Sequence, residues 1–111
     1  MTVILTPRTY EMRIFENDDA VASLTPPIGC AHVMVNEFNE AFITQLVILE
    51  KHQGKNWLSS AYEQLKNIGV KFVVYTMLVN GNKRTVRMAV KENCDENDMK
   101  RLKTMRKLDS L

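Results

Sequence analysis

Cys30 and His32 are the two residues whose types and spacing come closest to a reactive site. The segment around them is predicted to be a strand, where residues two apart lie on the same face. A thiolate beside an imidazole is a nucleophile pattern, and the pair also supplies two metal ligands. Zinc needs further ligands, and only Cys94 and His52 remain among the cysteines and histidines of the chain. A buried Cys and a packed His on a core strand is the commoner explanation, so we expect neither catalysis nor a metal here.

Other sequence patterns that carry chemistry are missing from the chain. Its four glycines fall at expected turns and caps and form no phosphate-binding loop. Neither G-x-S-x-G nor H-E-x-x-H occurs in the sequence. Acidic pairs such as Asp18 with Asp19 stand where helices are expected to begin, and capping explains them. We therefore expect a protein that binds rather than catalyses and that needs no cofactor, with an enzyme lacking a local motif as an alternative.

The charges of the chain are divided between its two halves. Residues 1–50 carry two basic and seven acidic side chains, and residues 51–111 carry thirteen basic and six acidic ones, so −5 and +7 sum to the net +2. This asymmetry favours one face suited to an anionic partner, and the alternative is that the halves attract each other within the fold. The cations that we assign to a nucleic-acid surface are Lys83, Arg84, Arg87, Lys100, Arg101, Lys103 and Arg106.

The spacing of apolar residues predicts alternating short strands and helices. Alternation predicts strands over 3–5, 9–15 and 30–35, with a short helix over 20–24 between the second and third. Asn36 is a good helix N-cap, and apolar residues at helical spacing follow it, which predicts a helix over 37–53. Asn56 caps a second helix over 56–68, and the short connection makes the two helices neighbours.

The C-terminal part predicts a hairpin and a last helix. Asn80 and Gly81 stand between β-rich segments over 70–79 and 83–91, which is the strongest short-range hairpin signal. Asp95 caps a helix whose apolar stripe is narrow and whose remaining surface is basic. Docking of that stripe on the chain's own sheet is the most frequent outcome for such a helix, and a partner or a second copy is the alternative. The stripe that we assign to a partner or to self-association is Met99, Leu102, Met105 and Leu108.

Together these elements predict an α+β fold with an antiparallel sheet, a central two-helix unit, a C-terminal β-hairpin and a terminal amphipathic helix. A helix, helix, hairpin order with a basic hairpin resembles the layout of a winged helix over about two-thirds of the chain, and that layout implies binding to DNA. We expect a small regulatory or inhibitory protein that acts through protein–protein contacts as a possible homodimer. A nucleic-acid-binding regulator is the alternative.

The length and composition of the chain set limits on these predictions. The 111 residues suit one domain over 1–111, and 45% hydrophobic with 25% charged residues is an ordinary globular composition. Two cysteines and the absence of a signal peptide or a membrane-length apolar run lead us to expect a reducing cytoplasm and no membrane partner. A single bridge between Cys30 and Cys94 is the alternative use of the two cysteines.

Overall fold

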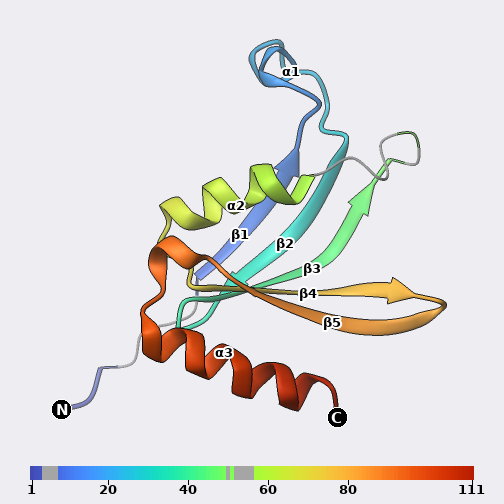
Figure 1. The fold of residues 1–111 in the computed structure, drawn as a ribbon. Coiled ribbons are helices and arrows are strands. Elements are labelled where there is room, and N and C mark those ends of the chain that lie inside the picture. Colours follow the sequence, from blue (N-terminus) through green and yellow to red (C-terminus); the bar gives the residue numbers. More distant parts are fainter. Residues whose placement is uncertain (4–7, 50, 52–56) are drawn as a thin grey trace.

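In the computed structural model, which describes residues 1–3, 8–49, 51 and 57–111, a mixed five-stranded sheet lies between two helices (Figure 1). The strands stand in chain order from β1 to β5, and every neighbouring pair is antiparallel except the parallel pair of β3 and β4. The fold is therefore α+β, as expected, but the sheet is mixed and not the antiparallel sheet that the sequence predicted. The elements are β1 (Arg8–Ile14), α1 (Asp18–Ala22), β2 (Gly29–Val35), β3 (Glu40–Ile48), α2 (Trp57–Asn67), β4 (Phe72–Val79), β5 (Asn82–Ala89), the 3-10 turn η2 (Lys91–Asn93) and α3 (Glu96–Asp109).

Residues 40–48 form a strand, so the helix expected over 37–53 is wrong for these residues. Asn36 makes the hydrogen bonds expected of a helix N-cap, but it makes them in a hairpin turn. Its Oδ1 accepts hydrogen bonds from the backbone N–H groups of Phe38 at 3.0 Å and of Glu40 at 2.9 Å. Asn39 completes the turn with a φ of 60°. Asparagine stabilises turns and helix starts by the same hydrogen bond, so its residue type does not separate the two structures.

A β-bulge explains why the apolar residues of β3 imitate a helix. Cys30 pairs with Val47 and His32 pairs with Thr44, so two residues of β3 stand opposite one residue of β2. Gln45, inside the bulge, has a φ of 53°. The bulge shifts the alternation by one residue, so neighbouring side chains on one face are three apart at the bulge and two apart elsewhere. Apolar spacing that mixes two and three is also what an amphipathic helix shows.

The sheet has two faces, which we name the α2 face and the α3 face after the helix that packs on each (Figure 1). Leu102 of α3 is buried, as are Phe72 and Val74 of β4. Side chains alternate along a strand, so these two residues point away from Val73, which lies between them and packs in the core beneath α2. The helices therefore cover opposite faces. The α2 core consists of Ala31, Val33, Val35, Ala41, Ile43, Leu65, Val70, Val73 and Val90.

Most other expected elements appear within a few residues of their expected bounds. Strands were expected over 9–15, 30–35, 70–79 and 83–91 and are β1, β2, β4 and β5, and the hairpin and the terminal helix are confirmed. The expected two-helix unit is instead β3 and α2, so the helix, helix, hairpin order of a winged helix is wrong for this chain. α2 carries the chain back so that β4 lies parallel to β3. The strand expected over 3–5 falls largely outside the described residues. No described helix combines the length and apolarity needed to cross a bilayer.

The start of α3 is fixed by a reciprocal capping box. Asp95 Oδ1 accepts from the backbone N–H of Asp98 at 2.8 Å, and Asp98 Oδ2 accepts from the backbone N–H of Asp95 at 3.0 Å. Lys71 Nζ lies 3.2 Å from the Asp98 carboxylate. The hydrogen bond from the Asp95 backbone, with help from Lys71, holds the pKa of Asp98 below its ordinary value of 3.8.

Replacing Gly29 with Ala should destabilise the β1–β3 end of the sheet. A Cβ at this position would lie 2.8 Å from the carbonyl oxygen of Val47, with Ile48 and Ile14 also close, so the backbone of β3 must move. We expect Gly29→Ala to lower the free energy of unfolding by about 1–3 kcal/mol, measured by urea denaturation. An unchanged urea midpoint would contradict this prediction, because it would show that the backbone of β3 can move aside without loss of stability.

Asp98→Asn should destabilise the protein at neutral pH, and this loss should shrink as the pH falls below about 3.8. The folded-state pKa of Asp98 is lowered, so its carboxylate stabilises the fold above the unfolded pKa and stops doing so as the pH falls through the folded one. Urea midpoints of wild type and variant between neutral pH and pH 2 test this. Glu37→Gln, in the exposed hairpin turn, is the control. A difference that stays constant with pH would contradict the assignment.

Candidate interaction surfaces

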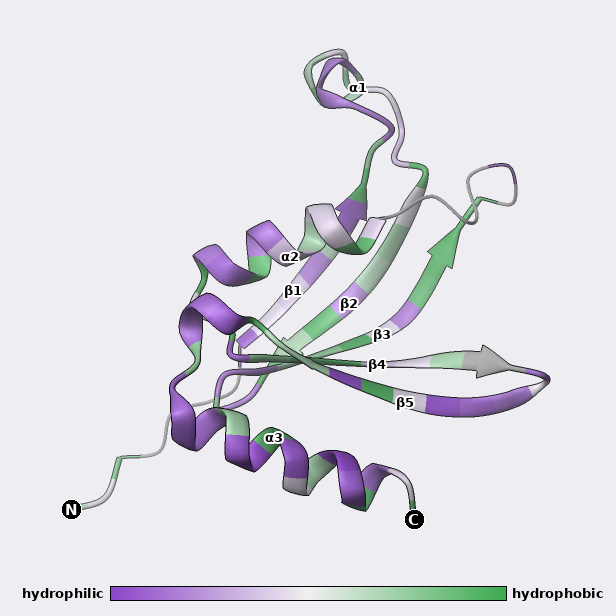
Figure 2. Ribbon diagram, viewed as in Figure 1, coloured by the Kyte–Doolittle hydropathy of each residue, from purple (hydrophilic) through white to green (hydrophobic). Residues whose placement is uncertain are grey.

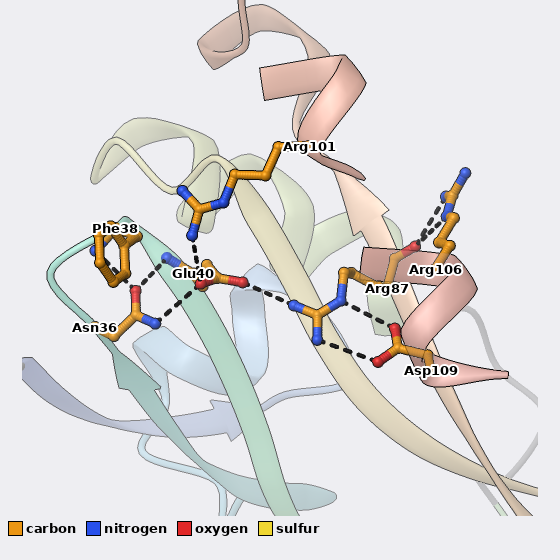
Figure 3. A network of polar contacts seen from close by, with 7 residues as sticks. All are labelled: Asn36, Phe38, Glu40, Arg87, Arg101, Arg106 and Asp109. Atoms are coloured by element: carbon orange, nitrogen blue, oxygen red, sulfur yellow. Dashed lines mark hydrogen bonds and ion pairs between the residues drawn. The ribbon is translucent and has the colours of Figure 1, made fainter. Parts of the chain in front are cut away.

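A buried carboxylate organises the α3 face (Figure 3). Glu40, the first residue of β3, is 6% exposed. Its Oε2 lies 2.7 Å from Nη1 of Arg87 on β5, and its Oε1 lies 3.5 Å from Nη2 of Arg101 on α3. Asn36 donates a further hydrogen bond to Glu40 at 3.2 Å. A buried carboxylate needs such partners, because losing water costs it several kcal/mol without them.

The same network joins α3 to β5. Arg87 donates to both carboxylate oxygens of Asp109, at 3.0 and 3.4 Å. The guanidinium of Arg106 donates two hydrogen bonds to the carbonyl oxygen of Arg87, at 3.0 and 2.8 Å. Arg101 also lies 4.7 Å from the centre of the Phe38 ring. Acidic and basic residues from the two halves of the chain therefore meet inside the fold at Glu40, Arg87 and Arg101.

The seven cations assigned to a nucleic-acid surface divide into two groups. Arg87, Arg101 and Arg106 bind the chain's own carboxylates or backbone (Figure 3). The side chains in the second group are exposed and lie on β5 and α3. The hairpin end of β5 extends beyond the C-terminal end of α3 (Figure 1), and this part of β5 is hydrophilic (Figure 2). The exposed group is Lys83, Arg84, Lys100 and Lys103.

The apolar stripe of α3 faces its own sheet over much of its length. Leu102 is 3% exposed and Met99 and Met105 are half-buried, whereas Leu108 is 63% exposed. Residues that pack within the chain offer little surface to a second protein. Self-association through this stripe stays a prediction, and Leu108 is the member that the fold leaves open to it.

Cys30 and His32 lie on the same face of β2, as expected, but both are exposed rather than buried. Cys94 is half-buried near the start of α3, where its Sγ donates to the carbonyl oxygen of Lys71 at 3.2 Å, and burial raises the pKa of its thiol. Both cysteines are free, which excludes the Cys30–Cys94 bridge. Within the described ranges, no three His, Cys, Asp or Glu residues gather as metal ligands, and His52 lies outside those ranges.

The α3 face is covered over β4, β5 and the Glu40 end of β3, and it is exposed over β1, β2 and the later part of β3. We name Cys30, His32, Met34, Thr44 and Val47 the open surface, and all five are exposed. Met34 is 45% and Val47 is 61% exposed, which is unusual for apolar residues in the inner strands of a sheet. Within the described part of the chain, no helix covers these five residues.

A cavity lies between α2 and β1 on the α2 face. It has a volume of about 620 Å³ and is lined by residues 10–16 of the β1 segment and by one side of α2. Its apolar lining includes Trp57, Ala61 and Leu65 of α2, together with Ile28 before β2 and Ile48 at the end of β3. Ser60 and Gln64, which are both exposed, add polar groups to the lining. A cavity of this size and apolarity is within the range that binds ligands or inserted side chains.

The strand beside this cavity is an edge of the sheet. β1 pairs with β2 on one side, and no described strand pairs with its other side. Its outer backbone groups are thus open to another strand. Glu11 and Arg13 project onto the α3 face, are exposed, and make no ion pair or side-chain hydrogen bond with the described residues.

Sequence reasoning did not single out the cavity or the β1 edge. The alternation of Tyr10, Met12 and Ile14 predicted the strand correctly, but alternation does not tell an edge strand from an inner one. The cavity wall comes from α2 and the loop before β2, which only the packing brings beside β1. The sequence did contain one signal for this site, the opposite charges of Glu11 and Arg13 on the polar face of the expected strand.

Arg87→Met should destabilise the protein strongly, because it leaves Glu40 buried with only Arg101 and Asn36. Breaking a buried pair in this way costs about 3–5 kcal/mol. Arg84→Met is the matched control on the same strand: its side chain is exposed, so we expect a change within about 0.5 kcal/mol. Urea midpoints measure both, and equal losses in the two variants would refute a stabilising role for the Glu40 network.

Comparisons with known proteins point to no relative. No family model, no curated protein and no solved structure matches this chain. A functional assignment therefore depends on the geometry of the described residues.

Proposed function

We propose that this chain is a non-catalytic binding protein with a regulatory or inhibitory role, which acts by contact with another protein. The observation that carries the proposal is the apolar cavity between α2 and β1, beside the open edge of β1. A strand edge binds an extended segment by backbone hydrogen bonds, and a neighbouring apolar cavity accepts alternate side chains of that segment. The two features together favour an extended segment of a protein as the occupant.

The charges of β1 narrow the chemistry of that segment. Glu11 and Arg13 are two residues apart on the exposed α3 face, and neither has a charged partner among the described residues. Opposite charges directly across two strands stabilise the pair, and like charges destabilise it. The matching segment therefore has apolar residues facing the cavity and a cation and an anion, two apart, on its other face.

Nucleic acid is the alternative partner, through Lys83, Arg84, Lys100 and Lys103. Three of the seven cations assigned to that surface are already bound within the chain, namely Arg87, Arg101 and Arg106. Phosphate binding needs several exposed cations, because each contact releases counterions. The smaller exposed set favours the protein-binding proposal.

The probe for the proposal is a displayed library of nine-residue peptides, with binding of enriched peptides measured by fluorescence anisotropy. We expect enriched peptides to alternate apolar and polar residues. Ser60→Trp places a large ring at the rim of the cavity and should weaken binding by about tenfold or more. Asn67→Trp adds the same ring at the exposed end of α2, away from the cavity lining, and should leave binding unchanged.

Two outcomes would refute the proposal. One is that no peptide is enriched, or that Ser60→Trp and Asn67→Trp bind equally well. The other is tight binding to duplex DNA whose affinity falls with salt at a log–log slope near −0.9 per phosphate and whose slope flattens in Lys83→Ala/Arg84→Ala. That result would transfer the function to the hairpin and α3.

A further inference from the structure

The charges of β1 are self-complementary about its central residue. Glu11 precedes Met12 and Arg13 follows it, and both charged side chains are exposed on the α3 face. If a second β1 runs antiparallel with Met12 opposite Met12, Glu11 of each copy stands opposite Arg13 of the other. Two such cross-strand ion pairs form, one on each side of the axis.

We propose that β1 pairs antiparallel with β1 of a second copy of this chain, in the register centred on Met12, and joins two five-stranded sheets into one. This inference rests on the proposed function, because it names the partner that occupies the same open edge. The contact is isologous: the same patch is used by both copies, so assembly closes at a dimer.

The neighbouring registers are unfavourable because they place like charges opposite each other or mismatch the two faces of the strands. A shift of two residues in one direction places Glu11 opposite Glu11, and a shift in the other direction places Arg13 opposite Arg13. Like charges directly opposite each other destabilise a strand pair. A shift of one residue sets the apolar residues of one copy opposite the charged residues of the other, since side chains alternate between faces. Among these neighbouring registers, the charge pattern therefore favours the one centred on Met12.

The apolar side of β1 agrees with this register. Tyr10 of each copy stands opposite Ile14 of the other, and the two Met12 side chains meet on the axis. Tyr10 is 37% exposed, and Met12 already packs against the α2 core. All three residues line the cavity beside α2. Pairing therefore extends the apolar floor of each cavity with side chains from the second copy.

The opposite edge of the sheet is less suited to strand pairing. The outer strand β5 begins with Asn82, Lys83 and Arg84, and charged residues on an edge discourage pairing. Arg106 also donates hydrogen bonds to the carbonyl oxygen of Arg87 on this strand, so that oxygen already has a partner.

The axis that relates the two copies is normal to the sheet. The two α2 helices therefore share one side of the joined sheet, and the two open surfaces share the other.

Charge reversal tests the register directly. We expect wild type to sediment as a dimer at about 10–100 µM. Glu11→Arg and Arg13→Glu should each raise the dimer dissociation constant by about tenfold or more, because each reversal turns two attractive contacts into repulsive ones. The double variant Glu11→Arg/Arg13→Glu should restore the dimer. A mixture of the two single variants should form a heterodimer, since each then meets only opposite charges.

The controls are Glu37→Arg and Lys83→Glu, which reverse exposed charges away from β1 and should leave the dissociation constant unchanged. Monomeric wild type across this range would overturn the self-pairing, and so would a dimer that ignores both single reversals or that the double variant does not restore. If wild type is monomeric but library peptides still bind in a manner lost in Ser60→Trp, only the identity of the partner fails. If the peptides also fail, the proposed function fails with it.

Discussion

The ion pair of Glu40 and Arg87 is the contact on which the arrangement of the α3 face depends. Glu40 is almost fully buried at the start of β3, and its carboxylate is compensated by cations from β5 and α3. Arg87 reaches Asp109 at the far end of α3, so the same guanidinium holds both that helix and the carboxylate. Such a pair contributes little net stability compared with an apolar substitute, but removing one partner is costly. It therefore restricts where α3 can lie.

That restriction decides which surfaces remain available. α3 is held over β4, β5 and the Glu40 end of β3, which leaves the α3 face exposed over β1, β2 and the later part of β3. The arginines that would strengthen a basic surface are used to hold the helix (Figure 3). The two sheet edges differ for related reasons: β5 carries cations and a side-chain contact to its backbone, whereas β1 stands open beside an apolar cavity. This difference between the edges favours the proposed protein partner at β1.

Much of the fold was predictable from local pattern. The Asn80-Gly81 hairpin, the Asp95 cap and the two later helices depend on residues close in sequence, and the structure has them near the expected bounds. Residues 40–48 were assigned to the wrong element because the bulge at Gln45 replaces strict alternation with a mixed spacing. Asn36 reinforced the error, because its side chain makes the same hydrogen bond in a turn as in a cap. Local pattern is weakest where two structures share both signals.

Local patterns were enough to predict the α+β class, the hairpin and the terminal helix, and the order of charges along β1 is plain from the residues. The packing of distant elements is what makes β1 an edge, places a cavity beside it, and binds three of the assigned arginines within the chain. The two kinds of feature differ in how far apart in the sequence the interacting residues lie. Capping, turn formation and alternation involve residues a few positions apart, whereas strand order and the compensation of Glu40 join residues 47 and 61 positions apart, which no local spacing records.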